Sequence, residues 1–185
     1  MRFMKFLAIA ISLSLFIGGC SDENSDEPLV STATFTLIDT NSKTYKVEKR
    51  GPNYSIDAGK DKVVLFDIFA TWCPPCQAES KHLAQLQQKY GDKLMVIGVT
   101  IEDDLSNEDL ESFKTKHAGG GDYIVVNKND NQPLARSIAS TIGVGQQFPL
   151  PLMVMYNKGE YVNHYAGATP QEILDRDIAT QLGMK

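Results

Sequence analysis

Apolar runs alternate with amphipathic stretches along most of the chain. The most continuous apolar run is Val63–Ala70, and a second one, Leu94–Thr100, follows it. Such runs are typical of strands that are covered on both faces of a parallel sheet. Between the two runs, apolar residues recur at helical spacing from Pro74 to about Tyr90, and Gly91 then ends the pattern. The middle of the chain therefore predicts a strand, a helix and a second buried strand.

Shorter elements are predicted on both sides of this unit. The expected strands are Thr34–Asp39, Thr44–Glu48, Tyr123–Asn127, Leu152–Tyr156 and Tyr161–Tyr165. The expected helices are Asn107–His117, Pro133 to about Thr141, and Pro170–Leu182. Gly51-Pro52-Asn53 is expected to break the pattern. Alternating strands and helices, followed by a hairpin and a helix, indicate one α/β domain with a mixed sheet.

The N-terminus has the pattern of a bacterial secretory signal. Arg2 and Lys5 precede residues 6–17, which are apolar except for two serines. A membrane-spanning helix needs roughly 20 residues, so this stretch is too short to be one. Cys20 follows two glycines, and this run resembles a lipobox, in which the cysteine is lipidated and becomes the first mature residue. Residues 1–19 are therefore expected to be a lipoprotein signal peptide; the alternative is an ordinary secretory signal with a cysteine at its cleavage site.

Polar and acidic residues follow the proposed lipidation site. Residues 20–29 are predicted to be a flexible tether, and residues 30–185 the folded domain. Without residues 1–19 the chain keeps 16 of its 18 basic residues against 23 acidic ones, so its formal charge changes from −5 to −7. A chain this acidic lacks the basic surface that nucleic-acid binding needs. The expected location is extracytoplasmic, on a bacterial membrane facing the periplasm, where disulfides persist.

The strongest chemical signal is the motif Cys73-Pro74-Pro75-Cys76, which follows the first buried strand and opens the predicted helix. Two residues between the cysteines let the sulfurs meet, and a helix N-terminus favours a thiolate on the first one. Helical spacing predicts that Cys76 faces inward together with Leu83, Leu86 and Tyr90. Cys73 is predicted to stay outside at the mouth of the helix. We therefore expect Cys73 to be the attacking sulfur and Cys76 the buried, resolving one.

Two alternative roles for the cysteine pair stay open at this point. A zinc site needs four ligands, and the chain, with three cysteines, has no second pair. Its histidines, His82, His117 and His164, lack the spacing of zinc ligands and are expected on the solvated surface. A static structural disulfide would close so short a loop that it would add little stability.

The run F-A-T-W-C-P-P-C-x-x-E, residues 69–79, resembles the thioredoxin superfamily, and most closely its TlpA/ResA-type thiol–disulfide oxidoreductases. The resemblance covers residues 30–185. It implies a thioredoxin-like α/β fold, with a mixed central sheet flanked by helices and an N-terminal β extension. The run from Pro151 to Gly159 resembles the strand and turn after the cis-proline of thioredoxins, although Pro149 could carry the cis bond instead. The implied substrate-binding groove is lined by Trp72, Pro74, Pro75, Leu150 and Pro151.

Two carboxylates are candidates for acid–base chemistry. Asp67 interrupts the first apolar strand, and strand alternation places it on one face with Val63, Leu65 and Phe69. Burying a lone carboxylate is costly, so Asp67 should be protonated near neutral pH or paired, for example with Lys62. The resemblance implies that Asp67 helps to move the proton of Cys76 and that Glu79 tunes the cysteines. On spacing alone, a surface position for Glu79 would be equally consistent.

These observations predict an extracytoplasmic thiol–disulfide oxidoreductase whose redox-active group is the Cys73–Cys76 pair, with no metal or nucleotide. The resemblance implies that it reduces client disulfides as a monomer, with electrons from a membrane thiol reductase, and that apocytochromes c are among its clients. One alternative is an oxidase or isomerase. Another is a non-catalytic lipoprotein that binds copper or haem, although copper-delivery relatives space their cysteines by three residues and add a distal histidine.

Overall fold

The computed structural model describes residues 30–103, 105–119 and 121–184. The predicted signal peptide, the predicted lipidation site Cys20 and the predicted tether lie outside these residues. The strands are β1 (Thr32–Asp39), β2 (Thr44–Arg50), β3 (Asn53–Ile56), β4 (Val63–Phe69), β5 (Leu94–Thr100), β6 (Ile124–Asn129), β7 (Leu152–Asn157) and β8 (Glu160–Ala166). The helices are α1 (Pro74–Tyr90), α2 (Asn107–His117), α3 (Asn131–Thr141) and α4 (Gln171–Gln181), with short 3-10 turns at Asp57–Gly59 and Gly91–Lys93.

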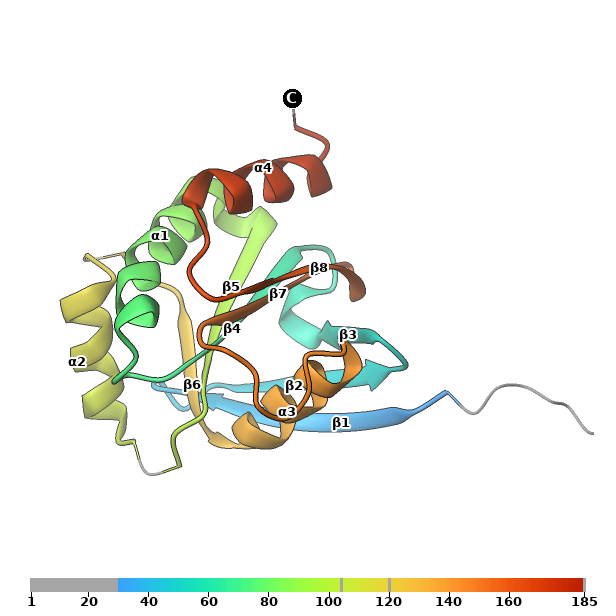
Figure 1. Cartoon of the computed structure of the whole chain (residues 1–185), viewed down its shortest axis with the longest axis horizontal. Helices are drawn as coiled ribbons and strands as arrows, with labels where there is room; N and C mark the ends of the chain where they lie inside the picture. Colours follow the sequence, from blue (N-terminus) through green and yellow to red (C-terminus); the bar gives the residue numbers. More distant parts are fainter. Residues whose placement is uncertain (1–29, 104, 120, 185) are drawn as a thin grey trace, which may run out of the picture.

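The described strands form one mixed sheet in the order β3-β2-β1-β6-β5-β4-β7-β8 (Figure 1). β4 lies between β5, which is parallel to it, and β7, which is antiparallel. Every residue of β4 and of β5 is buried. This burial explains their continuous apolar sequences, because neither strand has a solvent-facing side. The predicted mixed α/β architecture is confirmed, and β1 to β3 form its N-terminal extension.

Helices cover both faces of the sheet, and Figure 1 shows α1, α2 and α4 on the side opposite α3. On the first side, α1 packs against alternate β4 residues in a core cluster that includes Val63, Leu65 and Phe69. On the other side, α3 packs against Val64, Phe66 and Ile68, together with side chains from β1 to β3. The alternation along β4 therefore decides which of its side chains lie under α1.

Residues at its two ends determine where α1 begins and where it stops. α1 begins at Pro74, as predicted, because proline is well tolerated in a first turn whose N–H groups have no partner within the helix. The predicted inward face is confirmed, since Cys76, Leu83, Leu86 and Tyr90 are all buried. Gly91 ends the helix with a φ of 52°, a conformation that glycine adopts more easily than other residues.

Several boundaries differ from the prediction. The expected break at Gly51-Pro52-Asn53 is a tight turn at Gly51 and Pro52, with φ of 60° at Gly51, and the missed strand β3 already begins at Asn53. β3 is short, but Tyr54 and Ile56 alternate inward and are buried. α3 begins at Asn131, two residues before the predicted start at Pro133. These differences lie away from the cysteine motif and leave the central strand–helix–strand unit unchanged.

Within the described ranges, no helix has the length and apolar character that crossing a bilayer requires.

We expect Leu83→Ala to lower the free energy of unfolding by about 3 kcal/mol, because it leaves a cavity between α1 and the sheet. Leu83 has no exposed surface and shares the inward stripe of Cys76. Denaturant unfolding of the oxidised protein measures the effect. Gln85→Ala, an exposed position on the same helix, is the control and should stay close to the wild type. Equal stability of the two variants would contradict the packing of α1 described above.

Candidate active site

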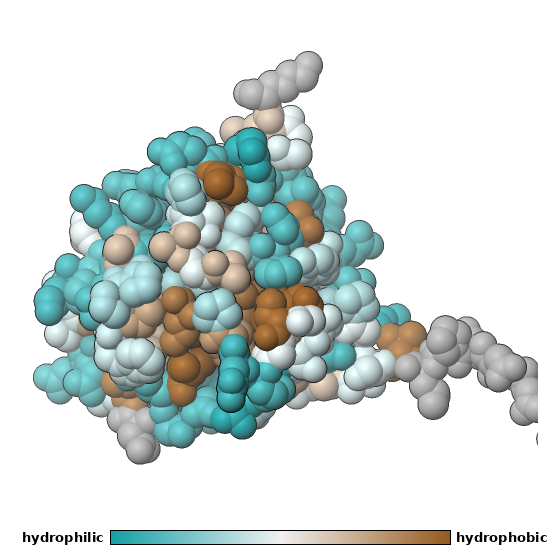
Figure 2. Space-filling view, viewed as in Figure 1, coloured by the Kyte–Doolittle hydropathy of each residue, from teal (hydrophilic) through white to brown (hydrophobic). Residues whose placement is uncertain are grey.

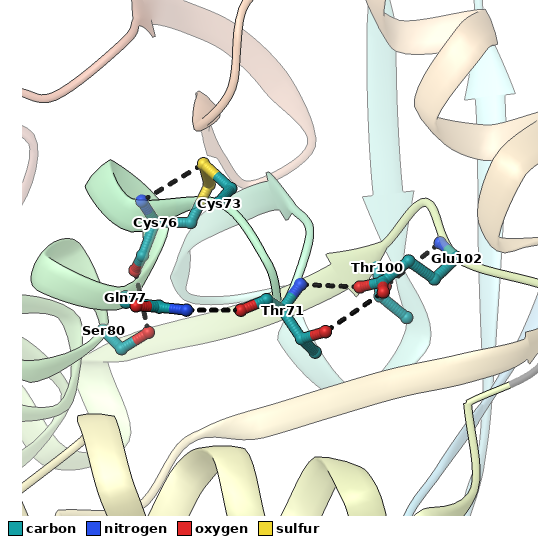
Figure 3. The surroundings of a disulfide bond; sticks show 7 residues. All are labelled: Thr71, Cys73, Cys76, Gln77, Ser80, Thr100 and Glu102. Carbon is teal, nitrogen blue, oxygen red and sulfur yellow. Dashed lines mark hydrogen bonds between the residues drawn. A yellow bond between two sulfur atoms is a disulfide. The ribbon is translucent and has the colours of Figure 1, made fainter.

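Cys73 and Cys76 are joined by a disulfide at the N-terminus of α1, with their Cα atoms 5.3 Å apart (Figure 3). β4 ends at Phe69, and a loop of four residues then leads from the centre of the sheet to the first turn of the helix. The redox-active pair is thus placed by two rigid elements. The position at the carboxyl end of a buried parallel strand is the one where α/β sheets commonly carry their sites.

The helix N-terminus presents a single backbone donor to the first sulfur. Cys73 is the N-cap residue, and its Sγ accepts a hydrogen bond from the Cys76 N–H, with 3.4 Å between N and S. Pro74 and Pro75 occupy the two positions between them and have no N–H to donate. A thiolate formed on Cys73 would therefore be stabilised by the Cys76 amide and by the helix dipole.

Both cysteine side chains are buried in the disulfide. Cys76 has no exposed surface, as predicted, but Cys73 is only 4% exposed, so the prediction that it stays outside is wrong for the oxidised protein. The disulfide holds the Cys73 sulfur against Cys76, and both residues belong to the core cluster against which Leu150 packs. The accessible part of the site is instead the Trp72 side chain, which is 65% exposed, together with Pro74 and Pro75.

Polar side chains fix the loop before the cysteines. Glu102 accepts hydrogen bonds from the Thr71 N–H and the Thr71 hydroxyl, at 2.6 Å and 3.0 Å. Gln77, on the first turns of α1, donates to the Thr71 carbonyl oxygen at 2.7 Å (Figure 3). Ser80 donates to the Cys76 carbonyl at 3.0 Å. None of these residues was predicted from the sequence; the one signal was that Glu102 follows the second buried strand, at the same edge of the sheet as the cysteines.

The segment between α3 and β7 contributes the cis-proline. The Leu150–Pro151 peptide bond is cis, whereas Pro149 is exposed and its bond is trans. Pro151 is buried, and Leu150 is partly buried against both core clusters. Figure 2 shows apolar side chains gathered near the middle of this face, over the segment that leads into β7. The structure thus combines an accessible indole with a partly apolar neighbouring surface.

Asp67 is buried in the middle of β4, directly below α1. Its side chain is 1% exposed, and Gly98 and Met153 are its cross-strand neighbours. Burial, and secondarily the charge of Glu79, raise the pKa of Asp67 to about 8. Its Oδ1 atom has no hydrogen-bond partner among the described residues, and no ion pair with Lys62 is found there either. The expectation of a carboxyl group that is protonated near neutral pH is met.

Glu79 lies on the inward side of α1 and is 3% exposed, so the alternative surface position is excluded. Its Oε2 accepts the Thr169 N–H at 3.5 Å, and its Oε1 lies 3.7 Å from Nδ1 of His82. Burial raises the pKa of Glu79, and the Thr169 N–H and His82 partly oppose this rise. His82 is therefore not simply a surface residue, because its Nδ1 is buried although 40% of its side chain is exposed.

Comparison with known proteins identifies the family. The family model for Redoxin matches residues 31–165. The chain belongs to the redoxin family. In the thioredoxin-like protein YneN of Bacillus subtilis, 51 residues are 41% identical to this chain, but they make up only 30% of that relative and 28% of this chain. The thiol-disulfide oxidoreductase ResA of Bacillus anthracis is 25% identical over 173 residues, which is 93% of this chain and 88% of ResA.

Solved structures confirm the thioredoxin-like fold. A thioredoxin-family thiol:disulfide interchange protein from Chlorobium tepidum matches with a TM-score of 0.61 and 19% identity, over 83% of this chain and 97% of that one. The exposed lipoprotein thioredoxin Etrx1 of Streptococcus pneumoniae matches with a TM-score of 0.52 and 21% identity, over 78% and 98%. Family, fold and disulfide together place this redoxin among the thioredoxin-family thiol–disulfide oxidoreductases.

The raised pKa of Asp67 has a consequence for stability. Below about pH 4 the carboxyl group is protonated in the folded and unfolded states, and its favourable contribution is fully present. Between about pH 4 and about pH 8 only the unfolded state releases the proton, so the contribution falls as the pH rises. Above about pH 8 the folded state releases it too, and the loss levels off. We therefore expect Asp67→Asn to gain stability relative to the wild type across this window, by at most about 1.4 kcal/mol per pH unit.

Denaturant unfolding of both oxidised proteins at several pH values between 4 and 9 measures this difference, and oxidation keeps the cysteines from titrating. Asp92→Asn removes an exposed carboxylate from the turn after α1 and is the matched control, which should parallel the wild type. A constant gap between Asp67→Asn and the wild type over the whole range would contradict the raised pKa.

Proposed function

We propose that this redoxin is an extracytoplasmic, lipid-anchored thiol–disulfide oxidoreductase that reduces disulfides in client proteins. The observation that carries the proposal is the Cys73–Cys76 disulfide at the N-terminus of α1, the helix that covers the face of β4 where burial raises the pKa of Asp67 to about 8. A sulfur at a helix N-terminus ionises readily, and a buried carboxyl group with a raised pKa can accept a proton. The redox-active group is the cysteine pair itself.

The reaction consists of two thiol–disulfide exchanges. The Cys73 thiolate attacks one sulfur of the client disulfide, a Cys73–client bond forms, and the other client sulfur leaves as a thiolate that takes a proton from solvent. Cys76 then loses its proton, and its thiolate attacks the Cys73 sulfur. The Cys73–Cys76 bond forms, the client bond breaks, and the second client sulfur leaves and is protonated. Two electrons pass from the cysteine pair to the client.

The side chains around the motif divide into two groups. The exposed Trp72, Pro74 and Pro75, with Leu150 and Pro151 beside them, form the surface against which a client segment binds. Asp67 on β4 and Glu79 on the inward side of α1 are both buried, and together they serve the proton of Cys76, because a thiol buried away from water ionises only with a nearby proton acceptor. Binding and proton transfer are thus separated by the disulfide.

The reduced form is regenerated by a membrane thiol reductase, and apocytochromes c are suitable clients. The similarity to the thiol-disulfide oxidoreductase ResA, which extends along almost the entire chain, supports the exchange chemistry on which this direction depends. The anchor is the diacylglyceryl group on Cys20, and Etrx1, described as an exposed lipoprotein, supports an anchored form of this fold. The acidic residues 20–29 would then hold the domain away from an anionic membrane surface.

We expect Cys76→Ser to accumulate stable mixed disulfides with clients, because Cys73 can attack but nothing can resolve the product. Non-reducing electrophoresis of the purified variant, followed by mass spectrometry of the reducible adducts, detects them. Cys73→Ser is the matched control and should trap almost nothing, since Cys76 has no exposed surface. Similar trapping by the two variants would show that the assigned roles of the two sulfurs are wrong.

Cys20→Ser should release the protein from membranes into the soluble fraction, since stable anchoring needs the acyl chains carried by that residue. Fractionation of cells that express each protein, with a salt wash of the membranes, measures the distribution. Disulfide reduction by the released protein should equal that of the wild type, because the cysteine motif is unchanged. A variant that stays with the washed membranes would refute the lipid anchor.

A further inference from the structure

His82 connects the buried carboxyl group of Glu79 with the surface of the protein. It lies one turn after Glu79 on α1, and 3.7 Å separate His82 Nδ1 from Glu79 Oε1. Both atoms are shielded from solvent, and neither has a hydrogen-bond partner among the described residues. The side chain of His82 is nevertheless 40% exposed. Because Nδ1 is buried, this exposed area belongs to other atoms of the side chain, so the imidazole reaches from the carboxyl group to water.

The other groups around Glu79 cannot carry a proton between its carboxyl group and solvent. From β4, Asp67 faces it as a second buried carboxyl group, which opposes its ionisation. From the segment before α4, the Thr169 backbone N–H donates to Glu79 Oε2, and a backbone amide does not change its charge near neutral pH. Tyr123, which precedes β6, is buried near Asp67, and burial and the Asp67 charge raise the pKa of its hydroxyl. Among these groups, His82 alone can become a cation and also has exposed surface.

We propose that His82 carries the proton between Glu79 and solvent during the resolving step. The inference rests on the proposed function and extends it by a residue outside the cysteine motif. A neutral imidazole can accept a proton on one ring nitrogen and release one from the other, so it conducts a proton without moving through the protein. At 3.7 Å the two atoms are beyond hydrogen-bond distance, but catalytic contacts often shorten only when the reaction partner is bound.

With His82 included, every proton moved in the resolving step has a donor and an acceptor. The S–H group of Cys76 gives its proton to the buried carboxyl pair, and the Cys76 thiolate attacks the mixed disulfide. Glu79 passes the proton to His82 Nδ1, the other ring nitrogen releases a proton to water, and the departing client thiolate takes one up from water. The carboxyl pair thereby returns to its starting charge. Without His82 the same proton would have to leave Glu79 through apolar packing.

The two exchanges can be separated with a chromogenic aromatic disulfide mixed with the reduced protein. Attack by Cys73 releases a first coloured thiolate, and resolution by Cys76 releases a second. We expect His82→Gln and His82→Ala to slow the second release roughly tenfold near pH 7 and to leave the first unchanged. Added imidazole should restore the second release in His82→Ala, because the shortened side chain leaves room for it. The pH profile of the second release should change in both variants.

His164→Gln is the matched control. His164 is a half-buried histidine on β8 whose Nδ1 lies 2.8 Å from the Tyr161 hydroxyl, remote in sequence from the cysteine motif. This variant should match the wild type in both releases. Thermal unfolding of all the variants shows whether a slow second release merely reflects a loosened fold.

The outcomes distinguish the inference from the proposed function. If His82→Gln resolves at the wild-type rate with the wild-type pH profile, His82 does not carry the proton. The inference also fails if His82→Ala is slow but added imidazole does not restore it, because its role is then packing. If the wild type itself never makes the second release, the proposed oxidoreductase function fails. A slow second release in both His82 variants, with rescue by imidazole, supports the inference.

Discussion

Burial of two carboxyl groups beneath one disulfide is the constraint on which the site depends. Asp67 and Glu79 are buried, and among the residues that the structure describes neither has a fully buried cationic partner. The protein therefore keeps at least one of them protonated near neutral pH, since two buried negative charges at close range would repel each other strongly. In a core that serves only to stabilise the fold, such a buried ionisable group lowers the free energy of unfolding. Beside a buried thiol, the member of the pair that stays ionised can accept a proton.

This arrangement shows how the fold separates electron transfer from proton transfer. The sulfurs lie at the end of α1, where Trp72 and the cis-proline segment provide the accessible surface. The two carboxyl groups, by contrast, are buried, with Asp67 1% and Glu79 3% exposed. Cys76 belongs to both regions, because its sulfur is bonded to Cys73 and its side chain lies on the buried stripe of α1.

The sequence predicted those features that depend on a single strand, helix or loop. The apolar run of β4, the proline start of α1 and the position of Pro151 could each be identified from local pattern or family resemblance. Contacts between distant segments could not be identified in this way. Glu102 is 31 residues from Thr71, and nothing in the local sequence of either residue indicates that they bond. β3 was missed because its four residues follow a strong turn signal, and packing within the sheet outweighs that signal.

The burial of Cys73, at the centre of the site, could not be predicted from the local sequence either. Helical periodicity describes the sides of a helix, but Cys73 is the N-cap residue, where the chain has just left the sheet and has extended backbone angles. Its exposure is set by what covers the helix end, namely the partly buried Leu150 and the disulfide itself. Reduction removes one of these two restraints, the bond to the Cys76 sulfur. The oxidised form has no attack to make on a client, and a reductase thiol has to open its disulfide before Cys73 can react again.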